Sequence, residues 1–251
     1  MPHIALQASP PDLFPIVAVV AILVFLVRVL SLIQRGPSLK TAATELGLRY
    51  DEVGPASWIT LSKKSWLQEN KERLAGLMAR RVPEFPLFGL GYTRRAVALL
   101  RGSFEGRSVT VIDFRYTAGG GEAPMTEAWL CAVTPAFATP QALSVMLRGR
   151  LSGLAHLLGG REVRTGFAAF DAAYLIACDD DEFARALFDD GMTSFFLDSK
   201  IAYRVEAAEG DLMCAAHSSQ LLPSMTKQVS DLLETLNGVA ARVPSALRPA
   251  S

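Results

Sequence analysis

The sequence predicts an α+β protein in which one N-terminal transmembrane helix is followed by a soluble domain of antiparallel sheet with packed helices. Three observations lead to this fold class. Residues 13–35 form an apolar run, apolar and polar residues alternate with a period of two from about residue 96, and residues 223–243 have the spacing of an amphipathic helix. The order of strands, helix, strands and helix also suggests two similar halves.

The apolar run is long enough to cross a membrane. From Leu13 to Ile33 there are roughly 21 residues, which extend about 31 Å as a helix, against a hydrocarbon core of about 30 Å. Arg28 lies near the far end, where its long side chain can reach the headgroups. A cleaved signal peptide fits less well because no basic residue precedes the run, and a buried core helix would need protein on every side.

The basic residues around the run predict its orientation. Arg28, Arg35 and Lys40 lie at its C-terminal end or beyond it, whereas residues 1–12 contain no lysine or arginine. The positive-inside rule then places the N-terminus outside and the main domain in the cytoplasm. Three widely spaced cysteines in apolar surroundings agree with a reducing compartment, and they are Cys131, Cys178 and Cys214.

The expected organisation has six segments. They are a short extracytoplasmic N-terminus (1–12), the transmembrane helix (13–35), a helical juxtamembrane segment (36–82), the α+β domain (83–222), the C-terminal amphipathic helix (223–243) and a tail (244–251).

The juxtamembrane segment contains a short helix that ends at Gly47, followed by a stretch with alternating charge. The basic residues of that stretch are either a solvated helix face or a contact with anionic lipid or a partner. These residues are Lys63, Lys64, Arg80 and Arg81.

Within the α+β domain, residues 96–117 predict a hairpin that turns at Glu105-Gly106. Its outgoing strand places Ile112, Phe114 and Tyr116 on one face, with Asp113 and Arg115 on the other. The remaining expected elements are a strand at 126–134, a helix at 139–160, a strand at 170–180, a helix at 180–191, and strands at 200–207 and 211–218.

The C-terminal helix has the clearest pattern in the chain and is expected to pack on the sheet. Its apolar stripe consists of Val229, Leu232, Leu233, Leu236, Val239, Ala240 and Val243.

Three groups of residues invite a chemical role, and each has a plainer alternative. Cys214 and His217 resemble half of a zinc site, but three residues apart on a strand they point to opposite faces. The acidic run at 179–182 could bind a cation, or it could occupy the first turn of a helix. Asp113 and Arg115 could be a catalytic acid and its orienting group, or a charge pair facing solvent.

No catalytic, cofactor-binding or metal-binding residue is therefore predicted, and an enzyme is the less favoured class. The three histidines lack a nucleophile elbow, and the glycine-rich stretch 118–122 lacks the lysine and the strand-to-helix setting of a phosphate loop. The 25 basic and 25 acidic residues give no net charge that would attract nucleic acid.

Several stretches resemble a group of uncharacterised bacterial single-pass membrane-anchored proteins with a C-terminal α+β domain. The resemblance rests on "LGLRY", on "FPLFGLGYTRRAVALLRGSFEGRSVTVIDFRYT" and on "GGREVRTGFAAFDAAYLIACDDDEFARALF". It implies a location at the bacterial inner membrane and supplies no catalytic residue.

We therefore expect a membrane-anchored cytoplasmic binding or scaffold domain that is an accessory subunit of a bacterial membrane protein complex. Residues 13–35 would contact lipid, a membrane protein would be the partner, and no cofactor is expected. The alternative is a small-ligand sensor or an enzyme with a cleft between the two halves, using Asp113, Arg115 or the run at 179–182.

Overall fold

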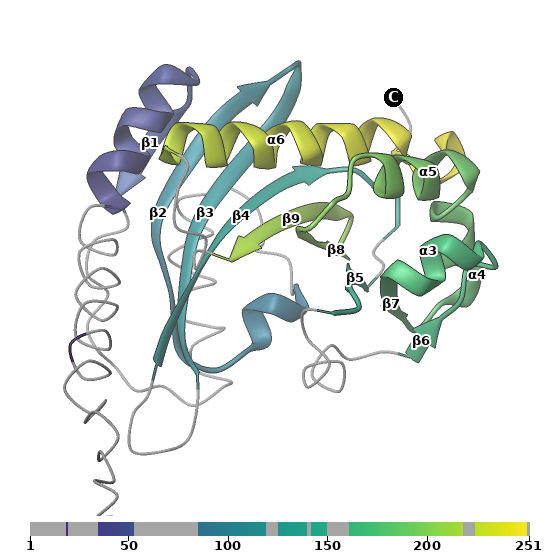
Figure 1. Ribbon diagram of the computed structural model, residues 1–251. Coiled ribbons are helices and arrows are strands. Elements are labelled where there is room, and N and C mark those ends of the chain that lie inside the picture. The colour runs from purple at the N-terminus through teal and green to yellow at the C-terminus, as the bar shows by residue number, and fades with distance from the viewer. Residues whose placement is uncertain are drawn as a thin grey trace, which may run out of the picture.

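The computed structural model describes residue 19 and residues 35–52, 85–118, 125–139, 142–149, 161–217 and 224–249. The strands of these parts form one sheet with the order β1-β2-β3-β4-β9-β8-β5-β7-β6 (Figure 1). Every neighbouring pair in this sheet is antiparallel. The strands are β1 (Arg49–Glu52), β2 (Tyr92–Phe104), β3 (Arg107–Ala118), β4 (Met125–Pro135), β5 (Leu143–Leu147), β6 (Arg161–Val163), β7 (Tyr174–Cys178), β8 (Arg204–Ala208) and β9 (Asp211–His217).

A long hairpin, β2–β3, begins the larger half of the sheet. Its turn is formed by Glu105 and Gly106, whose φ angles are 48° and 80°. Two successive residues with positive φ match the right-handed twist of the flanking strands, and glycine adopts this conformation without strain. The turn predicted from the sequence is confirmed.

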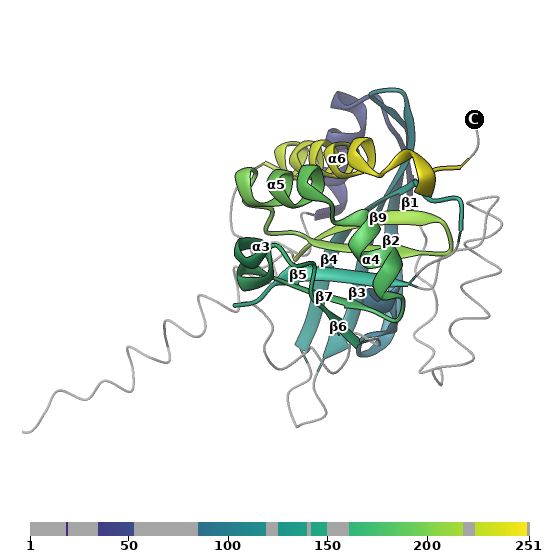
Figure 2. The ribbon, with the colours of Figure 1, turned by 90° about the vertical axis from the view of Figure 1, so that its right-hand side faces the viewer.

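Helices of the described residues cover one face of the sheet, which we call the helix face. They include α3 (Ala168–Ala173), α5 (Asp190–Asp198), α6 (Met225–Arg242) and an unlabelled helical segment at 35–45. Figure 2 shows α5 and α6 side by side above the strands, and α4 (Asp181–Leu187) lies near β7. A short 3-10 turn, η3 (Ser245–Leu247), follows α6.

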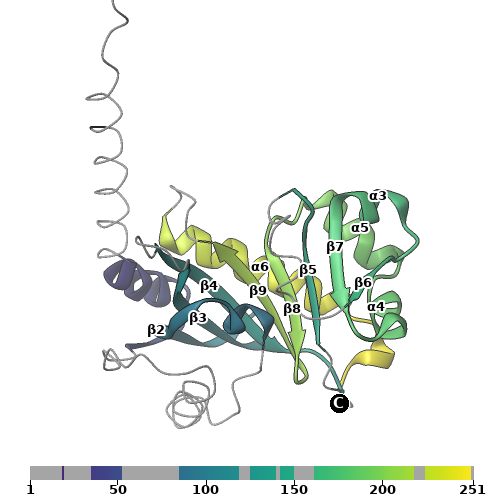
Figure 3. The same cartoon turned by 90° about the horizontal axis from the view of Figure 1, so that it is seen from below.

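The opposite face, which we call the η1 face, is covered by η1 (Pro86–Gly89) and its neighbours. Phe85, Leu87 and Phe88 pack there against Ile112 and Phe114 of β3. Figure 3 shows this turn in front of the strands, with α6 behind them. Both faces of the central strands are therefore buried.

Helix α6 has the amphipathic stripe that the sequence predicts. All seven residues of the predicted stripe are buried, and the helix packs on β4 and β9. Ser224 caps its N-terminus by accepting a hydrogen bond from Lys227 N at 3.2 Å. The prediction of a sheet-packed C-terminal helix is confirmed.

The predicted fold class is wrong. The strands belong to one continuous nine-stranded sheet with few helices, and not to two similar α+β halves. No helix among the described residues is long and apolar enough to cross a membrane. Of the predicted transmembrane segment 13–35, only Val19 and Arg35 belong to the described residues.

Three elements differ from the sequence-based expectation. Residues 143–147, expected within a helix, form β5 because a central position between β7 and β8 satisfies their backbone groups. Residues 170–173, expected to begin a strand, belong to α3 instead, and β7 begins after them. Residues 49–52 belong to the segment expected to be helical, and they form the edge strand β1.

Candidate functional site

Three charged side chains meet beneath the helical segment 35–45, and we call Arg35, Asp113 and Arg115 the arginine cluster. Alternation along β3 places Asp113 and Arg115 on the helix face. The helical segment lays an apolar stripe on the same face, with Leu39 and Ala42 fully buried. Arg35 is the first described residue of that helix, so docking of the stripe brings its guanidinium to β3.

One carboxylate serves both arginines of the cluster. Arg35 Nε lies 2.9 Å from Asp113 Oδ1, and Arg115 Nη2 donates a hydrogen bond of 2.9 Å to Asp113 Oδ2. The Asp113 side chain is fully buried, and the side chains of Arg35 and Arg115 are 5% and 11% exposed. The cluster thus holds two buried positive charges against one negative charge.

The hydrogen bonding of the cluster is incomplete. Arg35 Nη2 and Arg115 Nε are buried and have no hydrogen-bond partner among the described residues, and the Arg35–Asp113 contact lacks the direction of a hydrogen bond. Burial lowers the pKa of Arg35, and Arg115 lowers it further, while Asp113 opposes both effects. Buried donors without acceptors are costly, so the cluster needs an explanation beyond packing.

The neighbours of the cluster add positive charge. Arg95 of β2 stands directly opposite Arg115 in the register of the hairpin. Burial and Arg115 both lower the pKa of Arg95. Like charges directly opposite on neighbouring strands destabilise a sheet, so this pairing marks the surroundings of Asp113 as unusually basic.

The sequence interpretation of Asp113 and Arg115 as a pair facing solvent is wrong. The pair exists, but the helical segment 35–45 covers it, and Arg35 joins it from 78 positions earlier in the chain than Asp113. Alternation within β3 identifies the face that carries both residues, and it carries no information on what covers that face.

A second buried pair, Arg204 and Glu206 of β8, lies on the η1 face. Glu206 is fully buried and accepts hydrogen bonds from Arg204 Nε, from Leu87 N at 3.1 Å and from Ser144 Oγ at 3.3 Å. Burial raises the pKa of Glu206. The Arg204 side chain is 2% exposed, and its Nη1 and Nη2 have no hydrogen-bond partner among the described residues.

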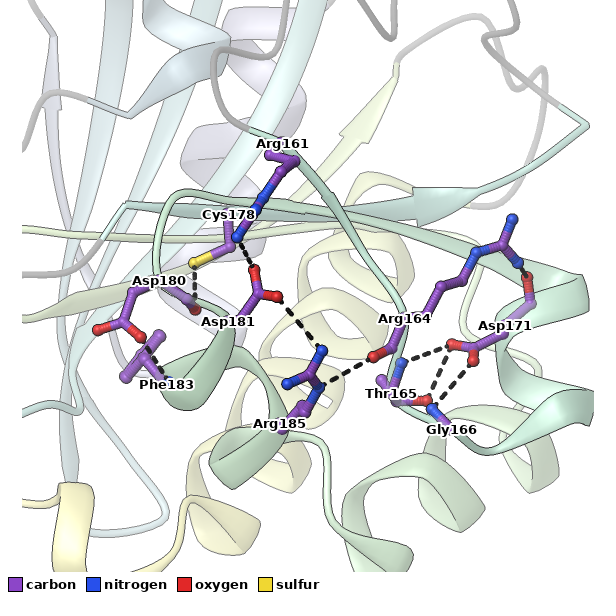
Figure 4. Close-up of polar contacts among 10 residues, drawn as sticks. All are labelled: Arg161, Arg164, Thr165, Gly166, Asp171, Cys178, Asp180, Asp181, Phe183 and Arg185. Carbon is purple, nitrogen blue, oxygen red and sulfur yellow. Dashed lines mark hydrogen bonds and ion pairs between the residues drawn. The ribbon is translucent and has the colours of Figure 1, made fainter.

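The acidic run at 179–182 is part of a polar network at the β6 end of the sheet (Figure 4). Asp180 caps α4, because its Oδ1 accepts a hydrogen bond of 2.9 Å from Phe183 N. Asp181 binds Arg161 at 2.5 Å and Arg185 at 3.2 Å. The helix-start interpretation of the run is confirmed.

The same network fixes the loop before α3. Asp171 accepts hydrogen bonds from Thr165 N at 3.0 Å, from Thr165 Oγ1 at 2.9 Å and from Gly166 N at 3.1 Å (Figure 4). Burial alone would raise the pKa of Asp171, but these hydrogen bonds outweigh it and lower the pKa. Asp171 is therefore a structural residue of this loop.

Cys214 and His217 lie on opposite faces of β9. Cys214 is buried in the core on the helix face, whereas His217 pairs with Glu127 and meets the Trp129 ring edge-on on the η1 face. Burial raises the pKa of the Cys214 thiol. In the part of the chain that the structure describes, no three His, Cys, Asp or Glu residues are grouped so that they could hold a metal ion.

The structure places two of the three residues predicted to set membrane topology, and their surroundings differ. Arg35 lies inside the protein, bound to Asp113, and Lys40 is exposed on the helical segment. The other predicted topology or contact residues lie outside the described residues, namely Arg28, Lys63, Lys64, Arg80 and Arg81. The predicted orientation and location stay predictions.

Sequence reasoning missed the sites of greatest interest, the arginine cluster and the Arg204–Glu206 pair. The turn at Glu105 does not predict that Arg95 faces Arg115, because this pairing depends on a register shift between Ala96 and Ala98. The participation of Arg35 had no local signal.

The comparisons with known proteins bear on the fold. No protein-family model matches the chain, and no curated protein sequence matches it. The chain is similar to the crystal structure of the mycobacterial trehalose monomycolate transport factor A, TtfA, with a TM-score of 0.52 and 14% sequence identity. The likeness covers 87% of this chain and 98% of that chain, so the two proteins share a fold over nearly their whole lengths.

Proposed function

We propose that this chain is an accessory binding subunit of a bacterial membrane transport complex. The observation that carries the proposal is the way in which residues 35–45 join the sheet. Arg35 is buried against Asp113, and Leu39 and Ala42 are fully buried on the helix face. The segment that follows the apolar run is thus held firmly against the sheet domain. A protein that holds a partner in position needs such a rigid attachment.

The fold supports the transport context. The solved structure that shares it is described as a transport factor, and the likeness extends over 98% of that chain. We take from it only the general role of an accessory to transport, because 14% identity does not carry over its cargo.

The proposal includes the location predicted from the sequence, at the bacterial inner membrane with the sheet domain in the cytoplasm. A membrane protein is the expected partner. The three cysteines agree with a reducing compartment, since each of them is buried and free.

Affinity purification of the full chain in mild detergent tests the proposal. A tag after Ser251 would follow a short tail and would not interrupt α6. We expect one membrane transport protein to co-purify in a near-equal molar amount, and to be absent when an unrelated tagged membrane protein is purified in the same way. A pure monomer that carries a bound metabolite would contradict the proposal.

A second candidate function is the sensing of a small ligand, and Arg204 favours it. Its guanidinium is almost fully buried and has two nitrogens without partners among the described residues. Tyr116 lies close enough for Arg204 to lower its pKa, although burial has the larger and opposite effect. The metabolite-bearing monomer named above is the outcome that this candidate predicts.

A further inference from the structure

We propose that the arginine cluster binds an oxyanion of the phosphate type between Arg35 and Arg115. The ligand is either a soluble phosphate or the phosphate of a lipid headgroup, because both present the same oxygens to a guanidinium. This inference does not rest on the proposed accessory role, since it concerns a property of the purified chain.

The first argument is charge. Asp113 is the only acidic residue of the described parts that contacts Arg35 or Arg115, and it contacts both. Arginine remains charged at neutral pH, so the three side chains carry a net positive charge in a buried setting. An oxyanion would supply the missing negative charge.

The second argument is hydrogen bonding. Arg35 Nη2 and Arg115 Nε are buried donors without acceptors in the described structure, although the same guanidiniums reach Asp113 through other nitrogens. Only 5% of the Arg35 side chain is exposed to solvent. An oxyanion with several oxygens can accept from both donors, whereas the two oxygens of Asp113 already face other nitrogens of the two arginines.

The third argument is position. Arg35 reaches Asp113 from the helical segment 35–45 and Arg115 reaches it from β3, so the two guanidiniums lie on the same carboxylate. Arg95, which stands opposite Arg115 across the hairpin, is partly exposed and adds a further positive charge beside the cluster.

The test uses the full chain in detergent, with inorganic phosphate as the soluble probe. The melting temperature is compared in phosphate and in chloride at equal pH and ionic strength, and phosphate binding is measured by calorimetry. Flotation with phosphatidylcholine vesicles, with and without phosphatidylglycerol, tests the headgroup. We expect phosphate to raise the melting temperature, or anionic vesicles to bind the chain more strongly than neutral ones.

Arg115→Gln is the informative variant and Arg49→Gln is its matched control. Arg49 is 69% exposed and pairs with Asp51 at 3.1 Å, away from Asp113. We expect Arg115→Gln to weaken binding of the effective probe by about tenfold or more, because one charge-assisted contact is lost, and Arg49→Gln to bind as the wild type does.

The two sources of the oxyanion give different results. If free phosphate binds and Arg115→Gln weakens that binding, the ligand is a soluble phosphate. If only anionic vesicles bind and Arg115→Gln weakens that binding, the ligand is a lipid headgroup. If Arg115→Gln does not fold, Arg115→Lys is used in its place. Lysine keeps the positive charge but lacks the planar guanidinium, so this variant should also bind the probe more weakly. The proposal is overturned if the wild type responds to neither probe, or if the Arg115 variant binds as the control does.

Discussion

At the scale of single residues, Asp113 is the carboxylate on which two buried guanidiniums depend. Replacing it with asparagine would leave Arg35 and Arg115 without their shared countercharge. Because an unpaired buried charge is costly, we expect Asp113→Asn to lower the free energy of unfolding by about 3–5 kcal/mol. Urea denaturation at neutral pH measures this loss.

Asp51→Asn is the control for that measurement, because Asp51 also binds two arginines but is 23% exposed. Its loss should be below about 1 kcal/mol, as for other pairs near the surface. Equal losses for the two variants would mean that burial does not make the Asp113 countercharge more important than that of the partly exposed Asp51.

Asp171 predicts a dependence of stability on pH. Its pKa is lower in the folded protein than in the unfolded chain, so its stabilising effect is complete above the unfolded value of about 4 and is lost as the pH falls through the folded value. We expect Asp171→Asn to cost about 2 kcal/mol at pH 7 and progressively less below pH 4. Urea midpoints of both proteins across this range would show the difference, and a gap that stays constant with pH would refute the assignment.

The sequence could predict parts of the residue-scale chemistry. Asp180 was expected at the start of a helix and caps α4, because a cap depends only on residues within one turn. The burial of Asp113, Arg204 and Glu206 could not be predicted in the same way. Charged residues that alternate with apolar ones along a strand are expected to face solvent. These three are buried because segments distant in the sequence pack over them.

At the scale of elements, α5 and α6 meet at a close contact between Phe195 and Gly238. A Cβ at Gly238 would lie 2.5 Å from Phe195 Cζ, and the Arg242 guanidinium lies 3.8 Å from the centre of the same ring. Alanine would favour the helix by about 1 kcal/mol, but the clash should outweigh this gain. We expect Gly238→Ala to lower the melting temperature.

The double variant Gly238→Ala with Phe195→Leu separates the two effects. The smaller side chain removes the ring that clashes, so the alanine should be less harmful in the Phe195→Leu background than in the wild type. An equal effect of the alanine in both backgrounds would show that the contact does not limit the packing of α5 on α6.

Elements with strong periodicity were predicted well, and the others were not. The hairpin β2–β3 and helix α6 follow from turn residues and from a regular apolar stripe. Residues 143–147 have a short apolar run that fits a helix or a strand, and the choice is made by the neighbours β7 and β8.

At the scale of the whole molecule, the continuous sheet changes the interpretation of the chain. The sequence predicts a cleft between two halves, but the described sheet is not divided into halves. Strand β8 pairs with both β9 and β5 and so joins the two ends of the sheet. The helical segment 35–45 is attached at one end of this sheet, next to β1 in Figure 1. The described strands thus form one continuous sheet, with buried charged residues on both of its faces.

The most direct test of the central claim, that the chain acts by binding a partner in a membrane transport complex, is the mass of the intact particle. Native mass spectrometry of the full chain, released from its own membranes in mild detergent, compares that mass with the 27.1 kDa of the chain. We expect a particle heavier than the chain by the mass of at least one membrane transport protein, in a fixed ratio. A particle with the mass of the chain alone, or of the chain with only a small metabolite, would contradict it.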